Sequence, residues 1–352
     1  MSLAQFLPWH EATASAWLAH RERFAHAWLI HGAAGIGKLD FAAAAAASLL
    51  CESPRNGLAC GECIACGWVR SGNHPDLRRI RPEAVAVEEG SDAATPDEEG
   101  GEAAPATGSS KRAPSKEIRV DQIRSLEPWF NTATHRGGWR VALIYPAHTL
   151  NVISANALLK VLEEPPAHTV FLMVVEAPDR LLPTLVSRCR RLPLATPPPE
   201  QALAWLREQG VRPAEGWLAA AGGAPLGALR LAQQGDSPVP AWLNQLTEPL
   251  AGGRQPDVGT LAETLEKLPA AEWLDALQRF YTDLMLAASG AAVRYFPALG
   301  QDVAAIGKRV RLAVVADAAR WLTRQRGLAS HPLNAKLFAH ATLQRVVLSC
   351  QG

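Results

Sequence analysis

The sequence lacks any apolar run long enough to cross a lipid bilayer, which takes about 20 consecutive apolar residues in a helix. Its longer apolar segments, such as residues 41–50, are far shorter than that. The first five residues, MSLAQ, also lack the basic and then apolar layout of a secretory signal peptide. We therefore expect a cytoplasmic protein without a membrane contact.

A strong net charge is missing as well. The 352 residues carry a net charge of +1, and 48% of them are hydrophobic and 20% charged, which is the balance of an ordinary globular protein. A chain of this length has room for two or three domains. The charge is unevenly spread, because residues 83–117 carry −6 and the remainder +7. A mildly basic folded part permits contact with DNA but does not require it.

The acidic segment 83–117 is rich in Glu, Ala, Gly, Pro and Ser and has almost no large apolar side chains. Such a composition cannot bury enough surface to offset the entropy lost on ordering. We predict a disordered insertion between two folded parts. A solvated linker is the simplest interpretation, and a regulatory or DNA-mimicking segment is the alternative.

The N-terminal part of the chain alternates between strand-like and helix-like patterns. Strands are predicted at residues 27–30, 118–120, 140–145 and 169–175, and helices at 39–50, 121–130 and 154–164, with Asp121 as an N-cap. This alternation favours a parallel, doubly wound α/β domain over residues 1–195. Beyond the proline-rich stretch 193–199 the pattern is helical throughout. We divide it into a small helical unit, 196–236, and a larger one, 237–352.

A phosphate-binding loop is indicated between the first predicted strand and helix. Gly32, Gly35, Gly37 and Lys38 fit the pattern G-x-x-x-x-G-K in the strand–loop–helix context that this motif requires. The glycines let backbone N–H groups turn toward phosphate oxygens, and Lys38 is placed to reach the terminal phosphates. A glycine-rich turn without nucleotide is the alternative interpretation.

The loop lacks the residues that hydrolysis needs. The position after Lys38, where a Ser or Thr hydroxyl normally holds Mg²⁺, is Leu39. The strand 140–145 ends without a carboxylate for the metal or the attacking water, and His148 is better explained as a surface residue than as a base. We therefore expect weak or absent ATP binding and no metal-assisted hydrolysis.

Four of the six cysteines fall within sixteen residues: Cys51, Cys60, Cys63 and Cys66. In a reducing compartment, clustered thiols indicate a metal site rather than disulfides. Four thiolates suit tetrahedral Zn²⁺ best, with an iron–sulfur cluster as the alternative. A site closed by four protein ligands is structural, so we predict a zinc module over residues 51–66. His74 is a nearby reserve ligand, or simply a turn residue before Pro75.

An arginine follows the last predicted strand, in the sequence Ser187-Arg188-Cys189. Taken alone, this tripeptide describes an exposed turn with a half-buried cysteine. A planar, permanently charged guanidinium is also the group that stabilises γ-phosphate charge across a subunit boundary.

Several passages, in this order along the chain, resemble the delta prime subunit of bacterial DNA polymerase III, a family within the AAA+ clamp loaders. They are residues 27–38, the four cysteines, NHPDL at 73–77, IRVDQIR at 118–124, NALLKVLEEPP at 156–166 and residues 182–189. Together they cover about residues 1–235, and the remainder is similar to the family only in length and helical character. The disabled nucleotide loop favours delta prime over the motor subunits.

The resemblance implies an α/β P-loop (AAA+-like) domain with an inserted zinc module, an all-α lid and an all-α C-terminal collar domain. It implies a clamp loader with motor (gamma/tau) and delta subunits, which loads the sliding clamp onto primer-template DNA. Arg188, with Ser187 and Cys189, is then an arginine finger for a neighbouring ATP site, and the chain is a subunit of the polymerase holoenzyme without catalysis of its own. Arg230 lies near the place of a nucleotide-sensing arginine but is displaced, so it receives no role.

Two other functions are compatible with the same residues. The first is an active P-loop motor with unusual metal ligands, which Gly37 and Lys38 support and Leu39 opposes. The second is a stand-alone zinc-dependent nucleic-acid binder. Turnover of ATP by the isolated chain distinguishes the first, and tight DNA binding that is lost on chelation distinguishes the second.

Overall fold

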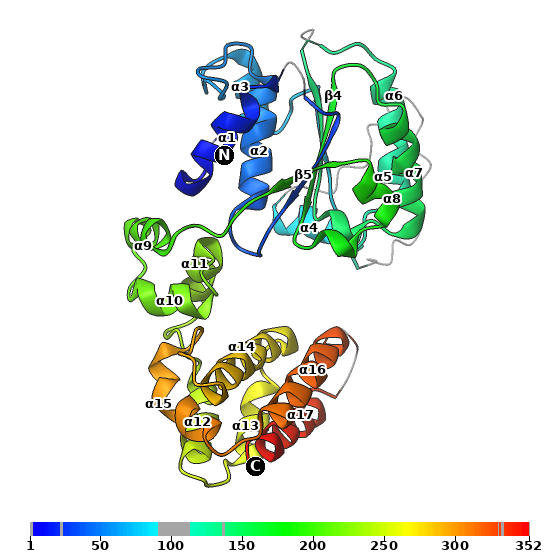
Figure 1. Cartoon of the computed structure of the whole chain (residues 1–352). Coiled ribbons are helices and arrows are strands. Elements are labelled where there is room, and N and C mark those ends of the chain that lie inside the picture. The colour runs from blue at the N-terminus through cyan, green and yellow to red at the C-terminus, as the bar shows by residue number, and fades with distance from the viewer. Residues whose placement is uncertain are drawn as a thin grey trace. The chain divides into compact units, whose positions relative to one another are not determined.

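The computed structural model describes residues 3–21, 24–90, 113–135, 138–329, 331 and 334–351. The chain divides into two compact units, Met1–Thr196 and Pro197–Gly352 (Figure 1). In these described ranges, every helix is too short or too polar to span a bilayer.

The first unit is built on a parallel sheet of five strands. The strands are β1 (Ala27–His31), β2 (Leu77–Ile80), β3 (Arg140–Ile144), β4 (Thr169–Val175) and β5 (Arg190–Pro193). Their order across the sheet is β2-β3-β4-β1-β5. All neighbours are parallel, and in the centre Ile30 lies opposite Val174 on one side and Leu192 on the other. The predicted parallel α/β fold is confirmed.

Helices cover both faces of this sheet. They are α1 (Glu11–Leu18), α2 (Lys38–Leu50), α3 (Ile64–Ser71), α4 (Glu83–Glu88), α5 (Val120–Arg124), α6 (Leu126–Phe130), α7 (Val152–Glu163) and α8 (Pro183–Ser187). Figure 1 shows α1–α3 on one side of the sheet and α5–α8 on the other. Side chains alternate along each strand, so Phe171, Met173 and Val175 of β4 join one core with Leu158 of α7 and Leu185 of α8. Each such fully buried side chain contributes about 1.5–3 kcal/mol.

The predicted strand at 118–120 is wrong. Ile118 forms only an isolated bridge with Leu150, and helix α5 already begins at Val120. The Gln122 side chain accepts the backbone N–H of Arg119 at 2.9 Å, so the residue before the helix is occupied by a capping interaction rather than a strand ladder. Asp121 therefore lies inside the helix and is not its N-cap.

The predicted helix 121–130 is two helices, α5 and α6, which meet at Ser125. Pro128 explains the break, because a proline has no N–H to donate and its ring would clash with the carbonyl of Arg124 in a continuous helix.

The prediction of disorder over 83–117 is wrong at both ends of the segment, and residues 91–112 lie outside the described part of the chain. Residues 83–88 form helix α4. Two tertiary contacts hold it: the Glu83 carboxylate accepts the N–H of Ser115 at 2.9 Å and pairs with Arg119 at 3.0 Å. Composition alone underestimated α4 because these partners are distant in the sequence.

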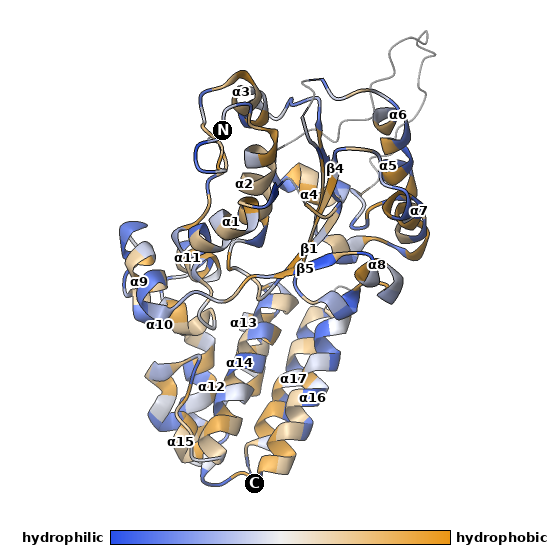
Figure 2. Ribbon diagram, turned by 45° about the horizontal axis from the view of Figure 1, so that its top comes forward, coloured by the Kyte–Doolittle hydropathy of each residue, from blue (hydrophilic) through white to orange (hydrophobic). Residues whose placement is uncertain are grey.

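The second unit is helical in its described residues. Its helices are α9 (Pro199–Glu208), α10 (Ala214–Ala220), α11 (Pro225–Gln234), α12 (Ala241–Ala251), α13 (Val258–Leu265), α14 (Ala270–Ala288), α15 (Gly300–Gly307), α16 (Leu312–Leu328) and α17 (Ala335–Ser349). The first three share a small core, and the others a larger one around Trp242, Phe280 and Tyr281. Figure 2 shows hydrophobic and hydrophilic segments alternating around these helices, as one-sided burial requires.

Candidate functional sites

The glycine-rich loop lies at the carboxyl end of β1 and leads into α2. Gly35 (φ 72°) and Gly37 (φ 92°) occupy the left-handed region that glycine tolerates. Gly32 has no room for a side chain, because a Cβ there would lie 2.4 Å from the backbone oxygen of Leu194, which follows β5. The glycines of the motif therefore lie where the backbone geometry favours them, and the loop packs closely against the residue that follows the neighbouring strand.

Lys38 turns back onto its own loop. Its side chain is buried, and Nζ donates a hydrogen bond to the backbone oxygen of Ala33 at 2.6 Å. Burial lowers the pKa of Lys38, and the nearby Glu176 carboxylate acts in the opposite direction. The charge that would bind a phosphate is thus already engaged by the protein.

A second contact closes the loop from the N-terminal side. The backbone oxygen of Ile36 accepts hydrogen bonds from Trp9 Nε1 at 2.9 Å and from His10 Nε2 at 2.8 Å. Both donors come from the 3-10 turn Pro8–His10. Burial is the main cause that lowers the pKa of His10, so its ring is held neutral with the proton on Nε2. We call Trp9, His10 and the carbonyl of Ile36 the N-terminal clasp.

The positions at which the sequence motif would place Mg²⁺ ligands, after Lys38 and at the end of β3, carry no carboxylate or hydroxyl of Ser or Thr. Leu39 stands half-buried at the first turn of α2. β3 leads into Tyr145, and His148 follows in a 3-10 turn, with Nδ1 buried and without a hydrogen-bond partner in the described residues. Burial is the main cause that lowers the pKa of His148, and the positive charge of Arg180 adds to it. A neutral imidazole in this position supplies no negative charge to hold a cation.

One residue of this site was missed by the sequence reasoning. Glu176 directly follows β4, and β4 rather than β3 is the neighbour of the P-loop strand. Its carboxylate is exposed, lies 4.0 Å from Arg180 and interacts electrostatically with Lys38 and His148. A carboxylate immediately after a buried apolar strand was the available signal. The sequence alone does not give the strand order, which is what shows that β4 lies beside the P-loop strand.

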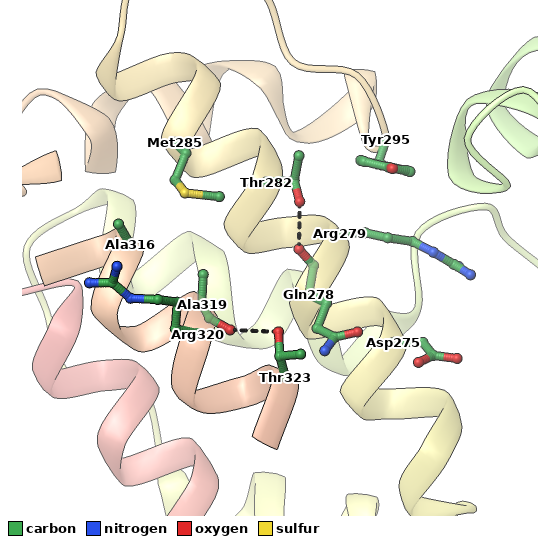
Figure 3. Close-up of a pocket in the computed structure, with 10 residues that line it drawn as sticks. All are labelled: Asp275, Gln278, Arg279, Thr282, Met285, Tyr295, Ala316, Ala319, Arg320 and Thr323. Carbon is green, nitrogen blue, oxygen red and sulfur yellow. Dashed lines mark hydrogen bonds between the residues drawn. The ribbon is translucent and has the colours of Figure 1, made fainter. Parts of the chain in front are cut away.

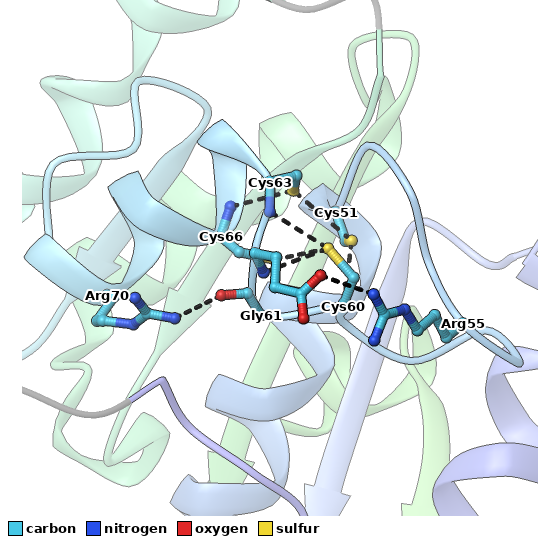
Figure 4. A network of polar contacts seen from close by, with 8 residues as sticks. Cys51, Arg55, Cys60, Gly61, Cys63, Cys66 and Arg70 are labelled. Atoms are coloured by element: carbon cyan, nitrogen blue, oxygen red, sulfur yellow. Dashed lines mark hydrogen bonds and ion pairs between the residues drawn. The ribbon is translucent and has the colours of Figure 1, made fainter.

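The four predicted metal ligands converge (Figure 4). The Sγ atoms of Cys51, Cys60, Cys63 and Cys66 all lie within 4.8 Å of one another. Cys51–Cys63 and Cys60–Cys66 are 3.9 and 4.0 Å apart. A tetrahedral Zn²⁺ with Zn–S bonds of about 2.3 Å requires sulfur–sulfur edges of about 3.8 Å. The donor set therefore fits a four-coordinate metal.

Local backbone geometry explains why these thiols point inward. Cys51 ends α2, and Cys63 is the N-cap of α3, where its sulfur accepts the N–H of Cys66 at 3.4 Å. The Cys60 sulfur accepts the N–H groups of Glu62 and Cys63 at 3.5 and 3.4 Å. These bonds lower the pKa of Cys60 to about 6, whereas burial raises the pKa of Cys51 and of Cys66.

His74 is not a fifth candidate ligand. It is buried, and its Nδ1 accepts the backbone N–H of Asp76 at 3.1 Å. The group of metal-capable side chains at this place contains the four cysteines without it. Its turn role before Pro75 is the one that the structure shows.

Arg188 follows α8 and precedes β5. Its side chain is 35% exposed and donates from Nη2 to Glu163 Oε1 at 2.5 Å and from Nη1 to the carbonyl of Thr184 at 3.0 Å. Ser187 is exposed and bonded to Thr184 as well, while Cys189 is buried, donates to Leu185 and has its pKa raised by burial to about 12. Cys189 thus anchors the turn that presents Arg188.

Strand direction separates Arg188 from the P-loop. The P-loop follows the carboxyl end of β1, whereas Arg188 lies just before the amino end of β5, where Arg190 pairs with Trp28. Because β1 and β5 are parallel neighbours, the P-loop lies at the carboxyl ends of the strands and Arg188 lies at their amino ends. Arg188 is therefore not directed at the nucleotide loop of its own chain.

A parallel α/β fold with a P-loop at the end of its first strand defines the class of P-loop nucleotide-binding folds. Within that class, residues 14–198 match the family described as DNA polymerase III, delta subunit, which is more than half of the chain. The chain belongs to this family.

Curated relatives agree with this assignment. The chain is 40% identical to the DNA polymerase III subunit delta' of Pseudomonas aeruginosa over 66% of its own length and 63% of the relative. It is 34% identical to the subunit delta' of Escherichia coli K12 over 59% of the chain and 54% of that relative. It is also 34% identical to subunit tau of Salmonella typhimurium over 47% of the chain and 21% of that relative. The match thus spans less than two thirds of each relative's length.

Proposed function

We propose that the chain is a non-hydrolysing, delta prime-type subunit of a bacterial DNA polymerase III clamp loader. In this role it joins motor (gamma/tau) and delta subunits that load the sliding clamp onto primer-template DNA. The observation that carries the proposal is the missing metal ligand of the P-loop: Leu39 follows Lys38 at the position where a Ser or Thr hydroxyl would hold Mg²⁺. The helices of the second unit then act as lid and collar.

In this proposal Arg188 completes the ATP site of a neighbouring motor subunit. Its position away from its own P-loop supports action in trans. The ion pair that holds it to Glu163 is half-exposed, and such pairs contribute only about 0–1 kcal/mol. Exchanging Glu163 for the γ-phosphate of a neighbour is therefore cheap, and the anchored Cys189 keeps the turn in place.

The test is the ATPase of the assembled complex with Arg188→Ala. Arginine fingers contribute about 10³–10⁵ in kcat, so we expect a large fall in turnover with assembly retained. Arg190→Ala is the matched control, since Arg190 is an exposed arginine two residues away on β5. An unchanged rate in the Arg188 variant would contradict the finger role, and ATP hydrolysis by the isolated chain would contradict the non-hydrolysing role.

We further propose that the four cysteines hold a structural Zn²⁺. Four thiolates at tetrahedral spacing are the donor set that zinc prefers, and no ligand position is left for a substrate. The ion contributes charge neutralisation and a covalent-like cross-link between the end of α2 and the start of α3. Metal analysis of the purified chain tests it: one zinc per chain is expected, and iron or no metal contradicts it.

Glu176 is the one observation that favours a second function, an active motor subunit. The Glu176 carboxylate lies after the strand next to the P-loop strand and interacts electrostatically with Lys38. DNA-stimulated ATP turnover by the isolated chain, lost in both Glu176→Gln and Lys38→Ala, distinguishes this function from the first. Turnover absent in the wild type excludes it.

A further inference from the structure

The partner of Arg188 within its own chain is the last residue of a neighbouring helix. Glu163 ends α7, and its Oε1 accepts a hydrogen bond from Nη2 of Arg188 at 2.5 Å. Figure 1 shows α7 and α8 on the same side of the sheet. The two residues lie 25 positions apart in the sequence, so the contact depends on the fold.

Helix stability does not explain the carboxylate of Glu163. The carboxyl end of a helix carries the negative end of the helix dipole, which favours a cation and disfavours an anion in the last turn. Glu163 and Glu164 nevertheless stand at this end of α7. The ion pair with Arg188 offsets the unfavourable position of Glu163, so the carboxylate is better explained by the guanidinium than by its own helix.

The backbone at Arg188 is fixed, whereas its side chain is not enclosed. The backbone N–H of Arg188 donates to the carbonyl of Leu185 at 3.1 Å, and that of the buried Cys189 donates to the carbonyl of Val186 at 3.3 Å. The Arg188 side chain is partly exposed, as is that of Glu163. The guanidinium can therefore change its partner by side-chain rotation while the turn stays in place.

The hold of Glu163 on Arg188 is weak compared with another ion pair of the chain. Asp275 lines the hollow between α14 and α16 (Figure 3), and its two oxygens accept Nε and Nη2 of Arg326 at 2.5 and 3.3 Å. Glu163 offers one oxygen to one nitrogen of Arg188. Two parallel bonds hold a guanidinium more firmly than one, so Arg188 is the easier of the two arginines to withdraw.

A terminal phosphate is a stronger acceptor for this guanidinium than a carboxylate is. It carries more negative charge and more oxygens, and arginine binds it through two parallel N–H groups. ATP presents such a group to an arginine that reaches its γ-phosphate, and ADP lacks it. The same guanidinium therefore exchanges Glu163 for ATP but not for ADP.

We propose that Glu163 is a positioning residue that competes with the γ-phosphate of a neighbouring subunit's ATP for Arg188. It holds the guanidinium while the neighbouring site is empty or contains ADP. It thereby weakens ATP binding at the subunit boundary and leaves ADP binding unchanged. The inference rests on the proposed function, in that Arg188 acts on the nucleotide of a neighbour.

The exposure of the ion pair sets the size of the effect. A pair of this kind shifts an equilibrium by at most about fivefold. The apparent affinity for ATP is reduced by the fraction of the chain in which Arg188 is free. Because Glu163 competes with the ground state and the transition state alike, its effect is on KM and not on kcat.

Glu163→Gln in the assembled complex tests the proposal, because the amide keeps the shape of the side chain and removes its charge. We expect the KM for ATP to fall by about two- to fivefold at unchanged kcat, with the same inhibition constant for ADP. Glu164→Gln, a change at the adjacent exposed glutamate, is the matched control and leaves all three values unchanged. An unchanged KM in Glu163→Gln, a lower kcat, or an equal change for ADP overturns the proposal.

A double-mutant cycle separates positioning of Arg188 from a general structural role. In the Arg188→Ala background, Glu163→Gln is expected to leave equilibrium binding of ATP to the complex unchanged, because the carboxylate has nothing left to hold. A persisting effect there overturns the proposal. Circular dichroism confirms that each variant is folded.

Arg188→Ala alone reports on the proposed function separately. If this variant leaves the ATPase of the complex unchanged, the finger role fails, and the role of Glu163 fails with it. If Arg188→Ala lowers the ATPase while Glu163→Gln and Glu164→Gln behave alike, only the role of Glu163 fails.

Discussion

The P-loop and the cysteine cluster are both short motifs that residue spacing identifies, but they differ in the partners of their polar side chains. In the P-loop, Lys38 is bonded to Ala33, and the N-terminal clasp occupies the carbonyl of Ile36. In the cluster, four sulfurs face one another, and their hydrogen-bond partners are backbone N–H groups and the other sulfurs. In the first motif the charged group is engaged by the protein, whereas in the second the four sulfurs lie at a spacing that a metal ion could bridge. Sequence spacing thus locates a motif, whereas the partners of each side chain distinguish how the two motifs are held.

The largest effect is expected from breaking the cluster. Cys66→Ser removes a buried sulfur from the tetrahedron and should abolish zinc binding. In zinc-finger peptides the apparent free energy of binding a structural Zn²⁺ is about 10–16 kcal/mol. We therefore expect the free energy of unfolding of the first unit to fall by several kcal/mol, an order-of-magnitude estimate. Thermal unfolding with metal analysis is the measurement. Cys350→Ser, a buried cysteine outside the cluster, should keep the zinc and cost about 1 kcal/mol.

The next effect tests whether the P-loop is now a structural element. Gly32→Ala forces a Cβ to within 2.4 Å of the Leu194 oxygen, which the backbone must relieve. We expect a loss of about 3 kcal/mol, at the upper end of local backbone strain. Gly72→Ala is the control, because Gly72 has a positive φ of 81° but open space around it. Equal stability losses in urea unfolding would show that the clash is relieved at no cost.

The sequence predicted the parts of the fold that depend on local pattern. The buried strands around Leu29, Leu143 and Leu172 were found because continuous apolar runs define central parallel strands. β2 and β5 were missed because LRRI and RRLP are short, two of the four residues in each are arginines, and both strands lie at the edges of the sheet. Their strand character comes from pairing with a neighbour, which a single sequence does not contain.

The same distinction explains the sites. The cysteines could be placed from spacing because a metal geometry relates nearby residues. Glu176 and the N-terminal clasp could not, because Trp9 and His10 meet Ile36 over more than 25 positions of sequence separation. The salt bridge of Arg188 with Glu163 was hidden for the same reason. Whether a motif residue is bonded within its own chain therefore depends on hydrogen-bond and ion-pair partners that are distant in the sequence, and residue types alone do not reveal these partners.

A moderate effect is expected from removing the P-loop ammonium. Lys38→Met keeps the aliphatic chain but deletes the bond to Ala33, and hydrogen bonds of charged groups contribute about 1.5–3 kcal/mol. We expect the stability of the first unit to fall by about 1–2 kcal/mol, while the ATPase of the assembled complex stays unchanged. Lys160→Met, an exposed lysine on α7, is the control for both measurements. A fall in ATPase without a fall in stability would show that Lys38 still serves a nucleotide.

The smallest effect is a pH dependence of the clasp. Burial lowers the folded-state pKa of His10 below its unfolded value of 6.5, so the unfolded chain binds more protons between these two values. The contribution of His10 is therefore complete above pH 6.5 and is lost as pH falls below it. His31, His74 and His148 have lowered pKa values as well and add slopes of the same sign. His10→Gln keeps a donor for Ile36 without a titrating ring, so its unfolding free energy should fall less steeply between pH 7.5 and 5.5 than that of the wild type. Identical slopes would show that the ring leaves the clasp, and the Ile36 carbonyl, before it is protonated.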